Sequence, residues 1–334
     1  MMRVLKPAAW FAPLLLAMFG LSAHAGDVGF QQLTIADGSD KPLAIGVWYP
    51  TDAAAKQTPL ETFTQDVATD APVIGQGLPL VVISHGSGGT FAGHYDTALA
   101  LAHAGFVVAA ATHNGDAYKD QGQMAQIWRR PAQLHRLVDY MLAEWPQHAA
   151  IDPGRVGVFG FSNGGFTALV AVGGTPDLRL LVPHCRHATT FECVGVVDKM
   201  TPADWAQFPP PGVVWVHDPR IKAAVIAAPG IGYTFGRAGL RDVSVPIQLW
   251  RAEFDHVEPS PYYVETVRDA LPTAPEYHLA ANADHYDFLA PCSAALVKYA
   301  PDICAERPGF DRAAFHAQFD TALVAFFERT LAAH

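Results

Sequence analysis

The sequence has little charge and, beyond its first 25 residues, no long apolar segment. Charged residues make up 16% of the 334 positions, and the formal net charge is −10. This acidic balance offers no basic patch to a phosphate backbone, which argues against nucleic-acid binding. No stretch after residue 25 stays apolar over the roughly 20 residues that a membrane-spanning helix needs. Because 50% of the residues are hydrophobic, we expect an acidic globular protein with a large core.

The sequence also lacks the common phosphate-binding and zinc-binding motifs. It contains no G-x-x-x-x-G-K-[ST], and no G-x-G-x-x-G with a later acidic residue. It contains no C-x-x-C and no H-E-x-x-H. His85, His94 and His113 fall in different predicted loops without ligand spacing, so a metallohydrolase is a distant alternative. The sequence therefore predicts no cofactor and no metal site.

The first 25 residues have the pattern of a secretory signal. Arg3 and Lys6 begin it, residues 8–21 are apolar, and Ala-His-Ala at 23–25 offers a small-residue cleavage site. The alternative is a buried N-terminal helix. We expect residues 26–334 to be exported, to the periplasm or the medium. No cysteine stands at the cleavage point, so we expect no stable membrane anchor after cleavage.

Four cysteines follow the predicted signal, at Cys185, Cys193, Cys292 and Cys304. An even number of cysteines in an exported chain indicates disulfides, and four cysteines allow three connectivities. Each close pair flanks a loop region that carries proline or glycine. We therefore favour Cys185–Cys193 and Cys292–Cys304, which would stiffen loops.

Strand-like and helix-like segments alternate along the chain. We predict strands over 31–36, 43–49, 78–84, 106–112, 156–159, 223–228, 247–251 and 277–281, and helices over 91–104, 130–145, 166–172 and 311–333. The run LPLVVIS at 78–84 is apolar without alternation, which is typical of a parallel strand covered on both faces. The order predicts an α/β fold: a mostly parallel central sheet with helices on both faces.

Residues 174–222 interrupt this alternation. The segment is long and irregular, and it carries seven prolines and the first cysteine pair. A loop of this length in a compact domain is often functional. Two interpretations stay open: a lid inserted after the helix at 166–172, or a surface excursion.

The motif Gly160-Phe161-Ser162-Asn163-Gly164 lies between a predicted strand and a predicted helix. A tight turn there forces the serine into a strained conformation and exposes its hydroxyl, while the flanking glycines avoid a steric clash. The N–H groups at the start of the helix also point toward the reacting oxygen. We predict that Ser162 is a nucleophile. The alternative is a glycine-rich turn in which Ser162 only caps the helix.

A serine nucleophile needs a base, and the base needs an acid that orients it. In this architecture the order along the chain is Ser, Asp or Glu, then His. Asp255 follows the predicted strand 247–251, and His285 follows the predicted strand 277–281. Both lie where strands end, at the edge where such sheets bind ligands. We therefore predict the triad Ser162, Asp255 and His285.

Other acids and histidines compete for these roles. Glu253 and Glu258 flank Asp255, but their positions after the strand are less suitable for reaching the catalytic histidine. His256 adjoins the acid, and His278 falls inside a predicted strand, so both are poorer bases. Asp287 lies two residues after His285, where we expect it to make local hydrogen bonds.

Acyl transfer also needs two N–H groups that donate to the developing oxyanion. We predict that one is the N–H of Asn163, directly after the nucleophile. The second should come from the loop His85-Gly86-Ser87-Gly88-Gly89, which follows the buried strand 78–84. We assign it to the N–H of Ser87, with Gly86 as the near alternative.

Together these segments resemble the α/β-hydrolases related to dienelactone hydrolase and the platelet-activating factor acetylhydrolases. The resemblance is carried by SHGSGG at 84–89, by IDPGRV at 151–156 with GFSNGG at 160–165, and by HYDF at 285–288. It extends from about residue 29 to residue 331. It implies the α/β-hydrolase fold, the Ser162–Asp255–His285 triad, and ester hydrolysis without a cofactor.

From these features we predict an exported serine carboxylesterase whose partner is a small-molecule ester. Phe91, Tyr95 and Phe161 would suit an apolar acyl or aryl group and equally suit the core, and Trp250 is better explained as core. A peptidase or amidase could use the same triad, and nothing in the sequence separates it from an esterase. A non-catalytic binding protein of this fold is a third hypothesis, which the presence of all three triad residues disfavours. The sequence predicts no oligomeric state.

Overall fold

A computed structural model describes residues 26–38, 40–195, 200–201 and 208–333. The predicted signal, residues 1–25, lies outside the described residues. The ten strands are β1 (Asp27–Ile35), β2 (Leu43–Thr51), β3 (Lys56–Leu60), β4 (Phe63–Thr69), β5 (Leu78–Ser84), β6 (Val107–Ala111), β7 (Ile151–Phe161), β8 (Ile221–Ala227), β9 (Ile247–Ala252) and β10 (Glu276–Ala280). They form one sheet in the order β10-β9-β8-β7-β5-β6-β2-β1-β4-β3.

The sheet is parallel from β6 through β5, β7, β8 and β9 to β10. Strand β2 pairs antiparallel with β6, and β1 pairs antiparallel with β2. All the predicted strands are present, and the predicted mostly parallel sheet is confirmed. Because parallel neighbours place their carboxyl ends at one edge, the loops after β5, β6, β7, β9 and β10 meet there.

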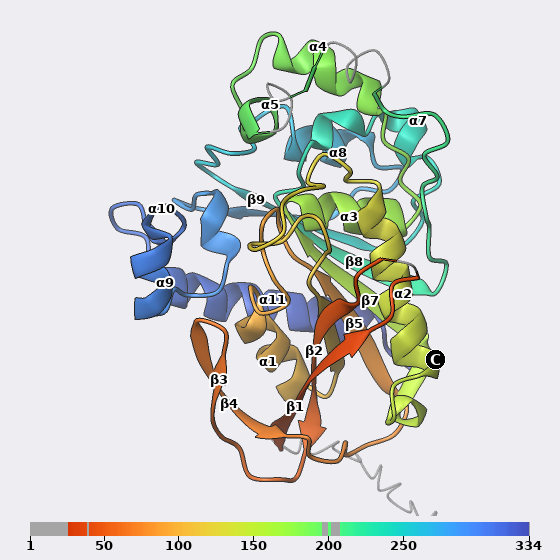
Figure 1. The fold of residues 1–334 in the computed structure, drawn as a ribbon, viewed down its shortest axis with the longest axis vertical. Coiled ribbons are helices and arrows are strands. Elements are labelled where there is room, and N and C mark those ends of the chain that lie inside the picture. The colour runs from red at the N-terminus through yellow and green to blue at the C-terminus, as the bar shows by residue number, and fades with distance from the viewer. Residues whose placement is uncertain (1–25, 39, 196–199, 202–207, 334) are drawn as a thin grey trace, which may run out of the picture.

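Helices cover both faces of this sheet (Figure 1). They are α1 (Tyr95–His103), α2 (Arg129–Ala143), α3 (Asn163–Ala171), α4 (Leu181–Cys185), α5 (Phe191–Gly195), α7 (Arg237–Leu240), α8 (Val264–Ala270), α9 (Ala294–Tyr299), α10 (Pro301–Cys304) and α11 (Arg312–Thr330). Helices α2, α3 and α8 pack into one core, and α1 and α11 pack into the other. Adjacent residues of β5 point to opposite faces: Val82 belongs to the first core and Val81 to the second. This explains why β5 is apolar from Leu78 to Ile83.

Strands β3 and β4 were not predicted. They form an antiparallel hairpin at the end of the sheet. Lys56 and Gln57 are exposed, and Pro59 interrupts the pattern, so β3 has no apolar run to recognise. Strand β4 alternates buried and exposed residues, and its buried Gln65 accepts a hydrogen bond from Nε1 of Trp48 at 2.8 Å.

Both predicted disulfides are present. Cys185 pairs with Cys193 and Cys292 pairs with Cys304, with Cα separations of 5.1 and 5.8 Å. The first bond links α4 to α5, which lie at the end of the molecule opposite the β3–β4 hairpin (Figure 1). Whether 174–222 acts as a lid stays a prediction. Within the described residues, no helix combines the length and apolar character that crossing a membrane requires.

Candidate active site

Ser162 lies in a strained turn between β7 and α3. Its φ is 54° and its ψ is −123°, a conformation that a residue with a Cβ rarely adopts. The turn also brings backbone atoms too close for side chains. A Cβ added to Gly160 would overlap the carbonyl oxygen of Gly164, and one added to Gly164 would overlap that of Ser84. Both glycines of the motif are therefore required by this geometry.

Asp255 and His285 form a buried pair on the loops after β9 and β10. Oδ2 of Asp255 is 2.9 Å from Nδ1 of His285, and both side chains are about 2% exposed or less. Oδ1 of Asp255 accepts hydrogen bonds from the N–H groups of Val257 and Glu258, at 3.0 and 2.6 Å. The carboxylate is thus held in position by two backbone donors. Because Nδ1 of His285 donates to Asp255, Nε2 is free to accept a proton.

The fold brings His285 to the turn that carries Ser162. Phe161 directly precedes Ser162 in the chain. The centroid of its ring lies 4.8 Å from the centroid of the His285 imidazole ring. Among the hydrogen bonds of the described residues, none joins Oγ of Ser162 to His285. Without substrate, such catalytic contacts are often long and tighten only when substrate binds. The three predicted residues therefore gather at one sheet edge, and their catalytic roles stay a prediction.

The competing histidines have other partners. Nδ1 of His256 lies 2.6 Å from Oδ1 of Asp284, which also accepts the N–H of His285. His278 stacks on Trp250 with 4.2 Å between ring centroids. Trp250 is 6% exposed, which agrees with its interpretation as a core residue. Neither histidine pairs with Asp255.

Asp287 holds the loop of His285 in place. As predicted, it makes a local hydrogen bond: its Oδ2 accepts the N–H of Asp284 at 2.7 Å. Its Oδ1 also lies 2.8 Å from Nη2 of Arg312, in an ion pair that is about 1% exposed. Nε2 of His316 donates to the carbonyl oxygen of Asp287 at 2.9 Å. Both partners lie on α11, so the loop is attached to the last long helix.

A charged cluster joins α11 to α1 below this loop. Nδ1 of His316 is 2.6 Å from Oδ2 of Asp96, and Oγ1 of Thr97 donates to Oδ1 of Asp320 at 2.7 Å. Burial, followed by the negative charge of Asp96, raises the pKa of Asp320 to about 7. Burial alone would lower the pKa of His316. The nearby carboxylates, first of all Asp96, have the larger opposite effect, so the pKa of His316 is raised.

We expect Asp320→Asn to raise the free energy of unfolding by about 1–3 kcal/mol at pH 8. The folded-state pKa of about 7 lies above the ordinary 3.8, so the wild type loses stability as the pH rises between these values. Asparagine keeps the acceptor for Thr97 without the charge. The gain should disappear below about pH 4. Urea unfolding at pH 4 and pH 8 measures it, with the exposed Glu328→Gln on the same helix as control; a gain that is equal at both pH values would contradict this explanation.

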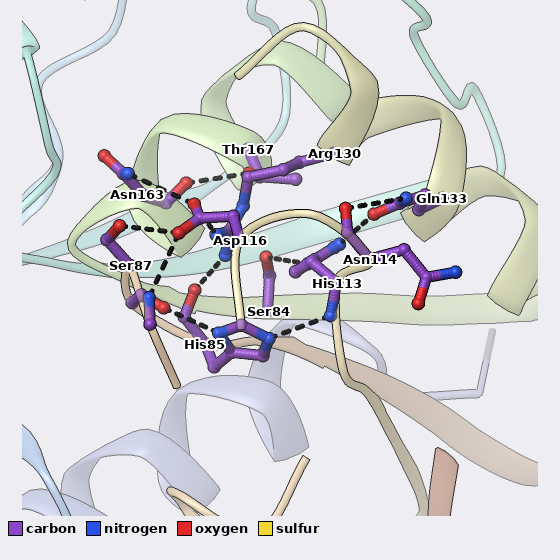
Figure 2. Close-up of polar contacts among 12 residues, drawn as sticks. Ser84, His85, Ser87, His113, Asn114, Asp116, Arg130, Gln133, Asn163 and Thr167 are labelled. Carbon is purple, nitrogen blue, oxygen red and sulfur yellow. Dashed lines mark hydrogen bonds and ion pairs between the residues drawn. The ribbon is translucent and has the colours of Figure 1, made fainter. Parts of the chain in front are cut away.

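Asp116 connects the loop after β5 to the first residue of α3, the two segments that carry the predicted oxyanion donors (Figure 2). Its Oδ1 accepts hydrogen bonds from Oγ of Ser87 and the N–H of Gly88, at 2.6 and 3.0 Å. Its Oδ2 lies 3.5 Å from Nδ2 of Asn163 and 2.6 Å from Nη1 of Arg130. A single carboxylate therefore positions residues from both sides of the predicted oxyanion hole.

Arg130 completes this network from the start of α2. The residue is 2% exposed. Besides pairing with Asp116, it donates to the carbonyl oxygen of His85 and, from Nε, to Oγ1 of Thr167 at 3.2 Å. Thr167 donates in turn to the carbonyl oxygen of Asn163 at 2.7 Å. The pair of Asp116 and Arg130 thus fixes the loop after β5 against the first turn of α3 (Figure 2).

His85 and His113 are neutral parts of the same network. Burial, followed by the charge of Arg130, lowers the pKa of each imidazole well below its usual value. Nε2 of His85 accepts the N–H of His113 at 2.9 Å. Nδ1 of His85 donates to the carbonyl oxygen of Gly86 at 2.6 Å. Nδ1 of His113 donates to Gln133, and its Nε2 accepts from the hydroxyl of Ser84. All four ring nitrogens are occupied, so these histidines are not available to a metal.

Comparison with solved structures decides the fold. A ferulic acid esterase from Streptomyces cinnamoneus superimposes with a TM-score of 0.64 at 19% identity, over 91% of this chain and 90% of that one. The chain has the α/β-hydrolase fold. The model of the prolyl oligopeptidase family (Peptidase_S9) matches residues 92–182, which include the turn of Ser162. No curated protein matches the chain. The fold that the sequence implied is confirmed, and the closer resemblance to dienelactone hydrolase or the acetylhydrolases stays a prediction.

A small cavity lies beside the predicted nucleophile. The cavity has a volume of about 40 Å³ and is lined, among others, by Asn163, Ile231, Glu258, Phe191, Glu192 and Leu181. Asn163 directly follows Ser162, and Phe191 and Glu192 come from the disulfide-linked segment. The insertion therefore contributes side chains to the space next to the site.

None of the three predicted pocket residues lines this cavity. Phe91 is 3% exposed and packs against Trp48, and Tyr95 packs against Phe63 at 4.8 Å between ring centroids. Phe161 is buried in the core formed with α1 and α11, and its ring contacts that of His285. Phe91 is a core residue and Tyr95 is partly buried against the same core, and their contact with substrate stays a prediction.

Sequence reasoning missed Asp116 and Arg130, although each leaves a signal. Asp116 follows the end of β6, so it belongs to the same sheet edge as the other site loops. Arg130 lies on the buried face of α2 together with Leu134 and Leu137. An arginine on the apolar face of an amphipathic helix indicates a buried partner.

Proposed function

We propose that this chain is an exported serine hydrolase that cleaves carboxylic esters of small to medium acyl or aryl groups. One observation carries the proposal: Ser162 occupies a strained turn at the sheet edge where the buried Asp255–His285 pair also lies. A strained serine turn, an imidazole with a free Nε2, and a carboxylate bound to Nδ1 are the parts that acyl transfer requires. The two disulfides agree with export.

The proposed reaction follows from these positions. Oγ of Ser162 attacks the ester carbonyl carbon while Nε2 of His285 takes its proton, and Asp255 stabilises the resulting imidazolium. His285 returns the proton to the leaving alcohol, and water then cleaves the acyl-enzyme by the same path. The N–H of Asn163 and one from the loop after β5 donate to the oxyanion. Gly86 is the close alternative to Ser87, because a Cβ on Gly86 would lie 3.3 Å from Cβ of Ser162.

Amide hydrolysis on the same triad is the second candidate. The match to the prolyl oligopeptidase family favours it, because the matched segment holds Ser162 and α3. The ferulic acid esterase favours ester hydrolysis, since its fold similarity covers 91% of this chain. We place esters first because amides need firmer protonation of the leaving group.

We expect the mature protein to hydrolyse p-nitrophenyl esters, and Ser162→Ala to lower kcat/KM by about 10⁴-fold or more. The series should run from acetate to long acyl chains, with p-nitroanilides as the amide arm. Circular dichroism and thermal melting establish that the variant folds. If the wild type and a folded variant share one background rate on every ester, the esterase proposal is wrong; cleavage of anilides alone would favour the peptidase.

A further inference from the structure

Asp284 connects the two loops that carry the predicted acid and base. It directly precedes His285 on the loop after β10, and His256 directly follows Asp255 on the loop after β9. Oδ1 of Asp284 accepts the N–H of His285 at 2.7 Å. The same oxygen accepts the N–H of His256 at 3.0 Å and a hydrogen bond from Nδ1 of the His256 ring at 2.6 Å. One carboxylate oxygen therefore holds the loop of Asp255 against the loop of His285.

This contact continues the pairing of β9 with β10 past the ends of the strands. Ala252 pairs with Ala280 at the end of the ladder. Two residues further along the first loop, the N–H of Phe254 donates to the carbonyl oxygen of Ala283 at 2.9 Å. The hydrogen bonds of Asp284 follow at the next residue of the second loop. Because they lie directly beside the predicted acid and base, they set how far apart the two loops stand there.

Asp284 is a charged acceptor on a fixed backbone. Burial would raise its pKa, but the hydrogen bonds from the ring and N–H of His256 and from the N–H of His285 outweigh burial and lower the pKa. The N–H of Asp284 donates to Oδ2 of Asp287 at 2.7 Å, and Asp287 is paired with Arg312 on α11. The carboxylate therefore keeps its charge at neutral pH, and its backbone is held from the side of α11.

The His285 ring depends on this support because it has a single hydrogen-bond partner. Among the hydrogen bonds of the described residues, the ring makes only the one from Nδ1 to Asp255, at 2.9 Å. Nε2 must stay free to take the proton of Ser162, so no second hydrogen bond can hold the imidazole. The separation of the two loops therefore sets the length of the bond to Asp255. A displacement of about 1 Å can lower a catalytic rate about 100-fold.

We propose that His256 and Asp284 are positioning residues, which fix the distance between Asp255 and His285 by holding their two loops together. This inference rests on the proposed hydrolysis. The side chains of His256 and Asp284 are 59% and 23% exposed, and exposed ion pairs contribute little to stability. Loss of the pair should therefore leave the fold and KM almost unchanged and lower kcat, because the oriented imidazole acts on the transition state.

Three substitutions test the pair through kcat. His256→Ala removes the ring donor, whereas His256→Asn places an amide N–H where Nδ1 stood, since both nitrogens are bonded to Cγ. His278→Ala is the matched control, because this ring also pairs with a carboxylate, Glu276, at 2.9 Å, and lies on β10. With p-nitrophenyl acetate we expect kcat to fall at least about tenfold in His256→Ala, to return to within about threefold of the wild type in His256→Asn, and to change less than about twofold in His278→Ala. KM should change less than about twofold, and the thermal midpoint by no more than about 3 °C.

A double variant tests whether the two residues act as one contact. Asp284→Asn removes the charge and keeps an acceptor for the N–H of His285. Combined with His256→Ala, it should lower kcat no more than the larger of the two single losses. Losses that multiply would mean that the two residues act separately, which would overturn the proposal.

Proton NMR reads the bond between Asp255 and His285 without substrate. The Nδ1 proton of His285 should give a downfield resonance that disappears in Asp255→Asn. We expect this resonance to move upfield or broaden in His256→Ala, and to keep its wild-type position in His256→Asn and His278→Ala.

Three outcomes would overturn the positioning role. One is an unchanged resonance and kcat in a folded His256→Ala. Another is an equal loss of kcat in His278→Ala, and the third is a loss of kcat that comes with unfolding, since the pair would then only support the structure. If the resonance responds as expected but the wild type cleaves no ester, the proposed function is wrong and the positioning of Asp255 and His285 stands.

Discussion

Replacing Asp255 by asparagine is expected to lower kcat for ester hydrolysis by about 10⁴-fold near neutral pH. In the wild type, Nδ1–H of His285 donates to Oδ2 of Asp255 at 2.9 Å. An amide NH₂ at this position would donate instead of accepting. The imidazole would then carry its proton on Nε2, where it could not accept the proton of Ser162. The loss follows from the wrong tautomer rather than from misfolding.

The substitution isolates this effect because asparagine keeps the second oxygen. Oδ1 of Asp255 accepts the N–H groups of Val257 and Glu258, and the amide oxygen of asparagine can do the same. We therefore expect Asp255→Asn to melt close to the wild type. Steady-state kinetics with p-nitrophenyl acetate, beside thermal melting, make the measurement. A folded variant that keeps kcat within tenfold of the wild type would remove Asp255 from the triad.

Breaking the buried pair of Asp116 and Arg130 should give the largest loss of stability. We expect Arg130→Met to lower the free energy of unfolding by about 3–5 kcal/mol, because it leaves a buried carboxylate without its cation. The side chains of the pair are 2% and 4% exposed. The substitution also removes the hydrogen bonds to the carbonyl oxygen of His85 and to Thr167. Urea unfolding, monitored by fluorescence, measures this change.

The same substitution should lower kcat more than it changes KM. Asp116 holds Ser87, Gly88 and Asn163 together, so its displacement shifts the predicted oxyanion donors, which act on the transition state. The double variant Arg130→Met/Asp116→Asn removes both charges and should recover part of the stability but little of kcat. Recovery of both together would mean that the pair contributes to stability alone.

What the sequence predicted well depends on local order along the chain. The strands were found because parallel strands covered on both faces are apolar at nearly every position, as Val81 and Val82 show. The strained turn at Ser162 was predicted because the glycines around it are required by close backbone contacts. The pairing of Asp255 with His285 at one sheet edge was predicted because each follows a strand in the order that the fold needs, and their catalytic roles stay a prediction.

What the sequence did not predict depends on contacts between distant segments. Glu192 and Glu258 lie in one cavity only because the disulfide-linked segment folds back against the loop after β9. The sequence left open whether Phe91 and Tyr95 contact substrate or the core, because an aromatic residue near a site loop has the same pattern in both cases. In the structure they pack against Trp48 and Phe63. The β3–β4 hairpin was missed because its polar, proline-containing strand is supported by its neighbours rather than by its own residues.

Covalent trapping tests most directly whether Ser162 is the nucleophile that His285 activates. The mature protein is incubated with a fluorophosphonate, digested, and analysed by mass spectrometry, with Ser162→Ala and His285→Ala in parallel. We expect one adduct per chain, on Ser162, no adduct in Ser162→Ala, and labelling at least 100-fold slower in His285→Ala. An adduct on another residue, no adduct on the folded wild type, or an unchanged rate in His285→Ala would contradict the proposed mechanism.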